Sequence, residues 1–165
     1  MDLSLEIAAP WPPGPDWPSL TLRCAEAAAA VAPELGNARL SADLLLADDV
    51  KVQTLNRQWR AKDKPTNVLS FPMLERVDLL ALGPDGPEEM LGDLALALET
   101  CQREAVDKSI PLEHHAAHLI VHGLLHLAGY DHETSPEDAA AMEALEIKAL
   151  AMLGLPDPYG DSHFA

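Results

Sequence analysis

Three histidines in the last third of the chain have the spacing of a metal site. His122 and His126 are four residues apart, and His132 follows six residues later. Residues at i and i+4 lie on one face of a helix, and Gly129 is suited to end that helix because glycine takes a left-handed cap at little cost. The chain can then turn back and bring His132 beside the other two. Three histidine nitrogens with an open fourth position are typical of catalytic zinc, so we predict a catalytic zinc site here.

A histidine pair at this spacing also occurs on ordinary helices, so the pair alone does not establish a metal site. The third histidine beyond the glycine favours a metal. Apolar residues fill most of 119–127 around the pair, which indicates a buried helix. Buried imidazoles need partners, because an unsatisfied buried polar group costs about 1–3 kcal/mol. A metal ion would satisfy one nitrogen of each ring.

A zinc site of this kind indicates hydrolysis, because bound zinc lowers the pKa of water to about 7 and polarises a carbonyl or phosphoryl oxygen. The same histidine and glycine spacing occurs in metzincin peptidases. Those enzymes need a glutamate directly after the first histidine as general base, and Gly123 occupies that position here. A peptidase is therefore the less favoured alternative.

The basic residues are concentrated in one segment of an acidic chain. The formal net charge is −16, which disfavours a nucleic-acid partner for the surface as a whole. Five of the eleven basic residues nevertheless fall within fourteen positions, namely Lys51, Arg57, Arg60, Lys62 and Lys64. This segment is either a solvated helix face or a local anion-binding patch, in which Arg57 and Lys62 would contact the substrate.

Phosphodiester hydrolysis fits these residues better than peptide hydrolysis, because it needs cationic groups for the charge on the phosphoryl oxygens. Arg60 is the candidate catalytic residue, since arginine binds phosphate through two parallel hydrogen bonds. Thr66 and Ser70 could add neutral donors. The alternative for Arg60 is a structural one, a helix-end arginine at the negative end of the helix dipole.

Other polar residues lie close in sequence to the predicted ligands. His118 is one turn before His122 and is a second candidate catalytic residue, as a proton shuttle, or else makes a structural hydrogen bond in a buried helix. Tyr130 and Asp131 lie in the return loop, where Asp131 could orient a ligand imidazole or stabilise the turn. The earlier histidines of this helix, His114 and His115, are expected to face solvent.

Hydrophobic periodicity predicts a single α/β (α+β) domain over 1–165, with residues 1–2 and 156–165 frayed. We expect a small mixed four-stranded sheet with five to six helices packed on it and the metal site on a central buried helix. The expected strands are 3–8, 38–47, 68–71 and 91–98. The expected helices are 19–32, one capped by Asp48 or Asp49 and running to Arg60, 99–107, one capped by Ser109 and running to Ala128, and one capped by Ser135. Residues 73–90 are expected to form a loop.

Three further expectations concern packing and location. The helix before Arg60 is expected to bury Val50, Leu55 and Trp59. Cys24 and Cys101 are far apart in the sequence and belong to no recognised cysteine motif, so we predict that both are reduced thiols in the core. The first residues lack a signal-peptide pattern, and no apolar run approaches about 18 residues, so we expect a soluble cytoplasmic protein with no membrane contact.

Two segments and one dipeptide together resemble the YbeY family of bacterial metal-dependent endoribonucleases. The run from His118 to His132 is similar to the family signature. Leu55-Asn56 with Arg60, Asp63 and residues 65–72 resembles a second motif, and Gly92-Asp93 a third. The resemblance implies zinc on the three histidines, an arginine at 60 that is important for activity, and cleavage of single-stranded RNA. It also implies 3′-end maturation of small-subunit ribosomal RNA and a part in ribosome quality control.

A third function class, besides nuclease and peptidase, is a non-catalytic ribosome-assembly factor with structural zinc. An acidic surface suits contact with basic proteins of the small ribosomal subunit. Whether the protein is an endoribonuclease or an assembly factor, the expected partners are single-stranded RNA, ribosomal RNA, and the small ribosomal subunit with its associated proteins.

Overall fold

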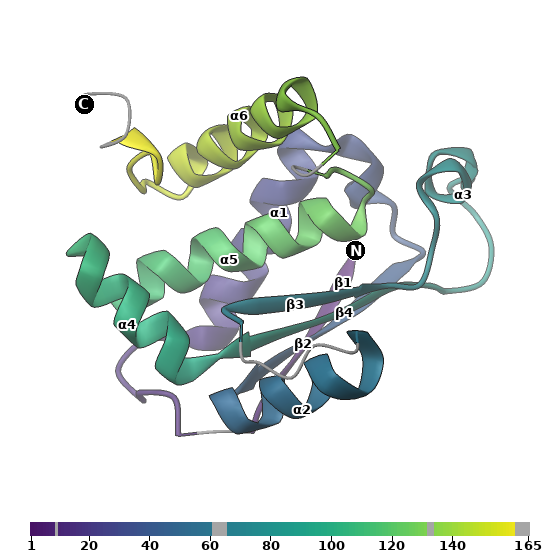
Figure 1. Cartoon of the computed structure of the whole chain (residues 1–165). Helices are drawn as coiled ribbons and strands as arrows, with labels where there is room; N and C mark the ends of the chain where they lie inside the picture. The colour runs from purple at the N-terminus through teal and green to yellow at the C-terminus, as the bar shows by residue number, and fades with distance from the viewer. Residues whose placement is uncertain (9, 61–65, 132–133, 161–165) are drawn as a thin grey trace.

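The computed structural model describes residues 1–8, 10–60, 66–131 and 134–160, without the Arg60 side chain (Figure 1). Within these residues the chain forms four strands, six α-helices and one 3-10 helix. In order they are β1 (Asp2–Ile7), α1 (Trp17–Val31), η1 (Pro33–Gly36), β2 (Leu40–Ala47), α2 (Asp49–Arg60), β3 (Val68–Pro72), α3 (Arg76–Ala81), β4 (Glu89–Ala97), α4 (Leu98–Lys108), α5 (Leu112–Leu127) and α6 (Pro136–Met152).

The four strands form one mixed sheet in the order β1-β2-β4-β3. Strands β1, β2 and β4 run parallel, and the edge strand β3 pairs antiparallel with β4. The predicted fold class, a mixed four-stranded sheet with five to six helices, is confirmed. A parallel pair needs a crossover connection, and α1 supplies the one between β1 and β2.

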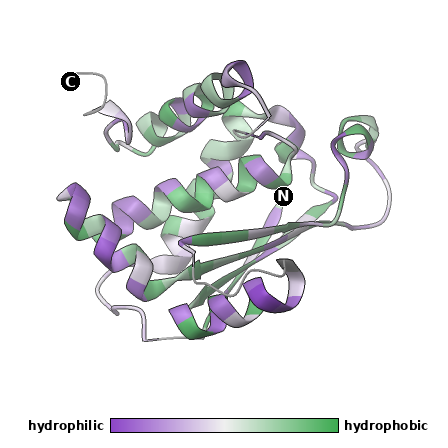
Figure 2. Ribbon diagram, in the orientation of Figure 1, coloured by the Kyte–Doolittle hydropathy of each residue, from purple (hydrophilic) through white to green (hydrophobic). Residues whose placement is uncertain are grey.

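Alternation along the central strands gives the sheet two apolar faces. Leu44, Leu46, Leu94 and Leu96 belong to the main core with α1 and α5, whereas Ala47, Ala95 and Ala97 pack with Val52 of α2. Figure 1 shows α2 on one side of the sheet and α1, α4, α5 and α6 on the other. In Figure 2 the strands β3 and β4 are largely hydrophobic, while α2 carries hydrophilic turns.

Helix α5 is the central buried helix of the fold, as predicted. It contacts β3 and β4 on one side and α1, α4 and α6 on the others. Ile120, Val121, Leu124 and Leu125 are each fully buried. Because burying one such side chain contributes roughly 1.5–3 kcal/mol, this packing fixes the position of the histidines on the same helix.

The structure corrects three details of the expected elements. Helix α2 buries Val52 and Asn56 instead of Val50 and Trp59, which are 73% and 72% exposed. Ser109 ends α4 with a φ of 56° and does not cap α5, which begins after Pro111. The short helix α3 lies within the expected loop 73–90.

The cysteine expectation agrees with the structure. Cys24 and Cys101 are buried free thiols. Burial raises the pKa of each thiol to about 12, so both stay protonated and unreactive. No helix in the described part of the chain is long and apolar enough to cross a membrane.

Candidate active site

Four histidines of α5 line one side of a polar cavity of about 540 Å³. They are His115, His118, His122 and His126. The opposite side is formed by residues 66–70, which lead into and along the edge strand β3. The histidines share this side because they follow the three- and four-residue spacing of one helix face. The cavity is therefore a direct consequence of the sequence pattern on a helix that the core holds in place.

The imidazole of His126 is oriented by β3. Its Nδ1 lies 3.0 Å from the Oγ of Ser70. With Nδ1 engaged in this way, the nitrogen that would hold a metal is Nε2, and Nδ1–H then donates to the serine oxygen. Ser70 was expected to contact the substrate phosphate, whereas its contact in the structure is with this histidine.

The imidazole of His122 is oriented by a carboxylate from α6. Its Nδ1 lies 3.2 Å from Oε1 of Glu146, which is 1% exposed. Burial by itself raises the pKa of Glu146, but hydrogen bonds from His118 and His122 outweigh it and lower the pKa to about 2. Glu146 is therefore a carboxylate at neutral pH, and its contact with Nδ1 leaves Nε2 of His122 as the nitrogen that would hold a metal.

His118 is buried against the same carboxylate. Its Nε2 lies 2.7 Å from Oε1 of Glu146 and 3.2 Å from the Tyr159 hydroxyl. Tyr159 also donates to Oε1 of Glu146 at 3.0 Å. Burial and the neighbouring Glu146 charge raise the pKa of Tyr159, so the phenol keeps its proton. His118 thus belongs to a hydrogen-bonded cluster behind the candidate ligand His122.

The expectation that His115 faces solvent is wrong. The residue is 1% exposed because α4 packs against this part of α5. Its Nε2 lies 2.7 Å from Oε1 of Glu104 on α4. Burial lowers the pKa of His115, so the neutral ring donates its Nε2–H to the carboxylate.

Sequence reasoning missed Glu104, Glu146 and Tyr159, which come from α4, α6 and the C-terminal turn. One signal was present for Glu146. It shares the buried positions of α6 with Met142, Ala149 and Leu150, at the spacing of one helix face. A carboxylate on an otherwise apolar stripe indicates a buried partner of opposite charge or a donor.

Gly123 has a packing role that explains the absence of a peptidase glutamate. A Cβ atom at this position would lie 2.7 Å from Cδ2 of Leu94 on β4. The glycine therefore lets α5 approach the sheet closely at the turn between the two candidate ligands. A glutamate there would have to displace a buried leucine, so this scaffold has no room for the peptidase base.

The remaining predicted site residues are distributed around the cavity. Thr66 lines it. Arg57 is exposed on α2, which ends at Arg60. The side chain of Arg60 and the whole of Lys62 and His132 lie outside the described residues. Among the described residues no group of three histidine, cysteine, aspartate or glutamate side chains is placed to hold a metal ion.

The return loop after α5 is tied to other elements. Gly129 ends the helix with a φ of 101°, which agrees with its predicted role as a helix stop. The Tyr130 hydroxyl donates to Glu34 at 3.1 Å, and the Arg76 guanidinium lies 4.6 Å from the ring centroid. Asp131 and His126 both line a neighbouring cavity of about 530 Å³. The two described candidate ligands, His122 and His126, each have Nδ1 held by an oxygen, which fits a borderline ion such as zinc.

A mixed sheet carrying a buried helix, with oriented histidines facing a polar cavity, defines an α/β protein with a candidate active site on its central helix. The family model of endoribonuclease YbeY matches residues 19–154. Endoribonuclease YbeY of Erythrobacter litoralis is 60% identical, with 98% of this chain and 99% of the relative covered. The relative of the same name from Novosphingobium aromaticivorans is 55% identical, with 95% of each chain covered.

The chain therefore belongs to the YbeY endoribonuclease family, and so to the nucleases among the hydrolases. The solution structure of a Thermotoga maritima protein is 21% identical, with a TM-score of 0.59 over 98% of this chain and 92% of that one. That likeness shows that the fold is shared.

Proposed function

We propose that the chain is a zinc-dependent endoribonuclease that cleaves single-stranded RNA in the cytoplasm. Its task would be the 3′-end maturation of small-subunit ribosomal RNA, with a part in ribosome quality control. The ion would be held by His122, His126 and His132. The observation that carries the proposal is the matched orientation of the first two, whose Nδ1 atoms are engaged by Glu146 and Ser70.

The chain's own residues supply the rest of the reaction. A zinc ion at the three histidines would provide Lewis-acid polarisation of the phosphoryl oxygen. Glu146 and Ser70 hold the rings of His122 and His126 through Nδ1, which would leave Nε2 of each ring for the ion. His118, behind His122, is our candidate for moving a proton. Thr66 at the cavity wall would donate to a phosphate oxygen.

Phosphate binding would fall to the basic segment that ends α2. Arg57 and Lys62 would contact the backbone of the RNA, and Arg60 would stabilise charge on the phosphoryl group. Because the whole chain carries a formal charge of −16, these contacts work against a repulsive background. Salt weakens the few phosphate contacts but also screens this repulsion, so binding should fall only gradually as salt concentration rises.

The cavity favours a catalytic over a structural zinc. Structural zinc sites are closed by four protein ligands, whereas catalytic sites keep a position for water or substrate. Here about 540 Å³ of space adjoins the candidate ligands. An assembly factor without turnover is the second candidate, favoured by the acidic surface, and its partners would be basic proteins of the small subunit.

The test compares the wild type with His126→Ala. We expect the variant to lose at least roughly tenfold in metal affinity and to show no cleavage of single-stranded RNA above background. His114→Ala is the matched control, since this histidine is on the same helix but does not line the cavity. Metal content is measured by elemental analysis and cleavage by gel electrophoresis of labelled RNA.

Full cleavage by His126→Ala would exclude the proposed mechanism. Zinc retention with no turnover by the wild type would instead favour the assembly factor. The biological role is checked by RNA sequencing of 3′ ends in cells that carry only the variant, where unprocessed small-subunit RNA should accumulate.

A further inference from the structure

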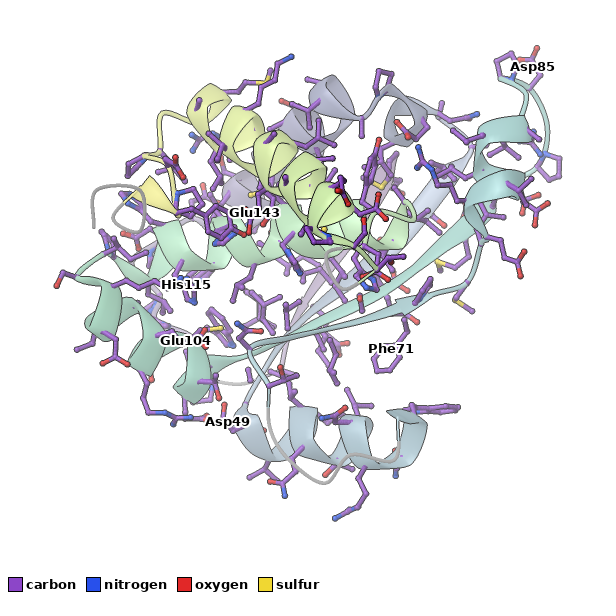
Figure 3. The ribbon with its side chains drawn as sticks, turned by 45° about the horizontal axis from the view of Figure 1, so that its top comes forward. Asp49, Phe71, Asp85, Glu104, His115 and Glu143 are labelled. Atoms are coloured by element: carbon purple, nitrogen blue, oxygen red, sulfur yellow. The ribbon has the colours of Figure 1, made fainter. Side chains whose placement is uncertain are left out.

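The end of the cavity remote from the candidate metal ligands contains a carboxylate that the proposed mechanism does not use. Glu104 of α4 lines the cavity, and its side chain is 35% exposed. Figure 3 shows it facing His115 of α5. His115 lies seven residues before His122, so about 10 Å separates them along the helix axis at 1.5 Å per residue. At this distance from His122, Glu104 would face a nucleotide next to the cleaved phosphate and not the phosphate itself.

Glu104 is held rigidly through one of its two oxygens. Oε1 accepts hydrogen bonds from Nε2 of His115 at 2.7 Å and from Nδ2 of Asn67 at 3.1 Å. Asn67 is itself anchored, because its backbone oxygen accepts from Ala97 N at 3.0 Å. The carboxylate is therefore fixed between α5 and the segment that enters β3.

The second oxygen keeps most of its capacity to accept hydrogen bonds. Among the described residues, the contact of Oε2 is with Nδ2 of Asn67 at a long 3.4 Å. An ionised carboxylate offers about four lone-pair positions. Oε2 is thus a preorganised acceptor at the edge of a cavity that is continuous with the candidate active site.

The position of His115 supports a binding role for this carboxylate. Within the described part of the chain the buried Nδ1 of His115 has no hydrogen-bond partner. The hydrogen bond of this ring is the one from Nε2 to Glu104. We infer that the buried imidazole, with one of its two nitrogens bonded, serves to hold that carboxylate in place. An apolar side chain would fill the same space without that cost if packing were the purpose.

We propose that Glu104 forms a nucleotide subsite, in which Oε2 accepts a hydrogen bond from a neutral donor of the RNA. A carboxylate repels phosphate, so the group it takes is an N–H or O–H. Nucleotides offer such groups on the base, as the exocyclic amino groups of cytosine, adenine and guanine and the ring N–H of uracil and guanine, and on the ribose, as the 2′-hydroxyl. The inference rests on the proposed cleavage of single-stranded RNA and gives that site a means of selection.

The test uses Glu104→Gln in the metal-loaded enzyme. Glutamine keeps an oxygen for His115 and Asn67 but replaces the second acceptor with an N–H₂ donor. The substrates are labelled oligo(C), oligo(A) and oligo(U), each also made with a single 2′-deoxy substitution next to the cleaved position. The readout is the ratio of kcat/KM between substrates, which does not depend on the fraction of enzyme that is folded.

A loss of roughly tenfold in kcat/KM for oligo(C) and oligo(A) relative to oligo(U) supports contact with the amino group, and the reverse order supports contact with the N3–H of uracil. An equal loss for all three RNAs that disappears on the 2′-deoxy substrates supports contact with the ribose. Unchanged ratios between bases and between ribose and deoxyribose would overturn the subsite. Glu113→Gln is the control, because it also removes one negative charge, from the neighbouring helix α5, at a position outside the cavity lining.

This experiment distinguishes a failure of the proposed RNA cleavage from a failure of the Glu104 subsite. Absence of RNA cleavage by the wild type would remove the proposed function. Cleavage by the wild type with unchanged ratios in Glu104→Gln would remove only the subsite.

Discussion

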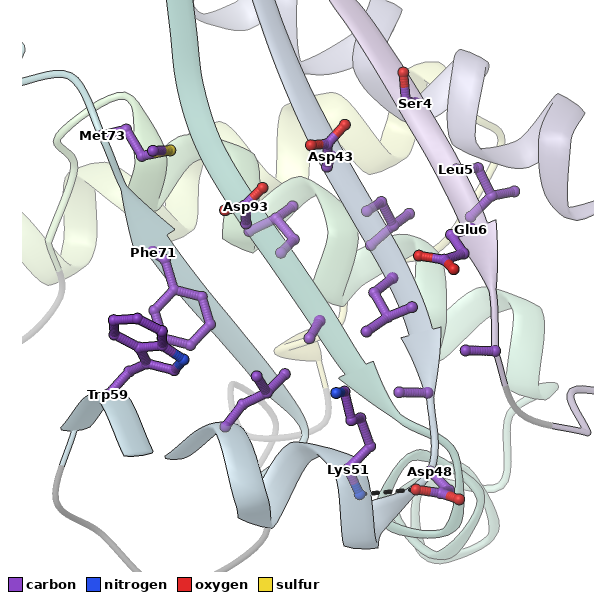
Figure 4. A pocket seen from close by; sticks show the side chains of 17 residues that line it. Ser4, Leu5, Glu6, Asp43, Asp48, Lys51, Trp59, Phe71, Met73 and Asp93 are labelled. Carbon is purple, nitrogen blue, oxygen red and sulfur yellow. Dashed lines mark hydrogen bonds between the residues drawn. The ribbon is translucent and has the colours of Figure 1, made fainter. Parts of the chain in front are cut away.

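The two faces of the sheet carry cavities of different chemistry. The face packed against α5 holds the histidine cavity of about 540 Å³, and the face that α2 covers carries a groove of about 950 Å³ (Figure 4). In the groove, Trp59 and Phe71 lie beside one another at one side. Asp43 and Asp93 project from neighbouring strands. The first cavity is lined mainly by imidazoles and other polar groups, and the groove mainly by apolar groups with carboxylates on its strands.

Carboxylates on the two faces have opposite pKa shifts. Burial raises the pKa of Glu146, but the histidine donors bring it down to about 2. Burial raises the pKa of Asp93 too, and Asp43, opposite it in the β2–β4 register, raises it further. The comparison teaches that the donors around a carboxylate, more than burial, decide whether the charge is stabilised. The face packed against α5 therefore provides donors and acceptors that orient imidazoles, and the groove on the α2 face disfavours anions.

The largest effect should come from Gly123→Glu, which tests whether the close approach of α5 to the sheet defines the histidine face. A buried glutamate beside Leu94 should lower the free energy of unfolding by more than about 3 kcal/mol. Chemical denaturation measures this. Gly83→Glu is the control, since nothing lies within 4 Å of a Cβ at Gly83. Equal stability of the two variants would contradict the packing role of Gly123.

A smaller effect is expected from Glu146→Gln, which removes the charge that orients His122. Metal affinity should fall by about 10- to 100-fold, because a neutral amide is a weaker partner for a ligand imidazole. Competition with a chelator measures the affinity, and the absorption spectrum of a cobalt-substituted sample reports the ligand geometry. Glu143→Gln on the same helix is the control. Unchanged affinity and spectrum would separate Glu146 from the metal site.

The smallest effect should come from Asp93→Asn in the groove. A raised pKa means that the folded state binds the proton more tightly, so the pair favours stability at low pH and costs stability as pH rises above the ordinary value of 3.8. The variant should be more stable at neutral pH by a few tenths of a kcal/mol, the cost of like charges opposite one another in a sheet.

Thermal unfolding of wild type and Asp93→Asn between pH 4 and 7 checks this sign, where ~0.5 kcal/mol corresponds to about 1–2 °C. Asp85→Asn, in an exposed loop, controls for the change in net charge. A variant that is less stable than the wild type at neutral pH would show that the charges of Asp43 and Asp93 do not destabilise the groove face.

Local patterns allowed much of the fold to be predicted. Asp48 accepts from Lys51 N at 2.8 Å before α2, and Ser135 accepts from Asp138 N at 3.0 Å before α6, as expected of capping residues. These contacts involve residues three apart, so the sequence contains both partners. The spacing of the histidines on α5 was recoverable for the same reason.

Contacts between distant elements were not predictable in this way. Glu146 and Glu104 reach the histidines from α6 and α4, and their pairing depends on how three helices are packed. The buried face of α2 was misjudged because Asn56, 2% exposed, belongs to it, whereas the more hydrophobic Trp59 does not. Helix α3 escaped prediction because no side-chain hydrogen bond caps its N-terminus.

The carboxylate oxygen shared by His118, His122 and Tyr159 has a consequence for protein synthesis. His118 and His122 precede the groups that orient them, because Glu146 follows His122 by 24 residues and Tyr159 follows His118 by 41. A nascent chain that has only reached α5 holds His118 and His122 without the groups that orient them. These two imidazoles therefore take their final positions only once residues 136–159 have been synthesised and have packed against α5.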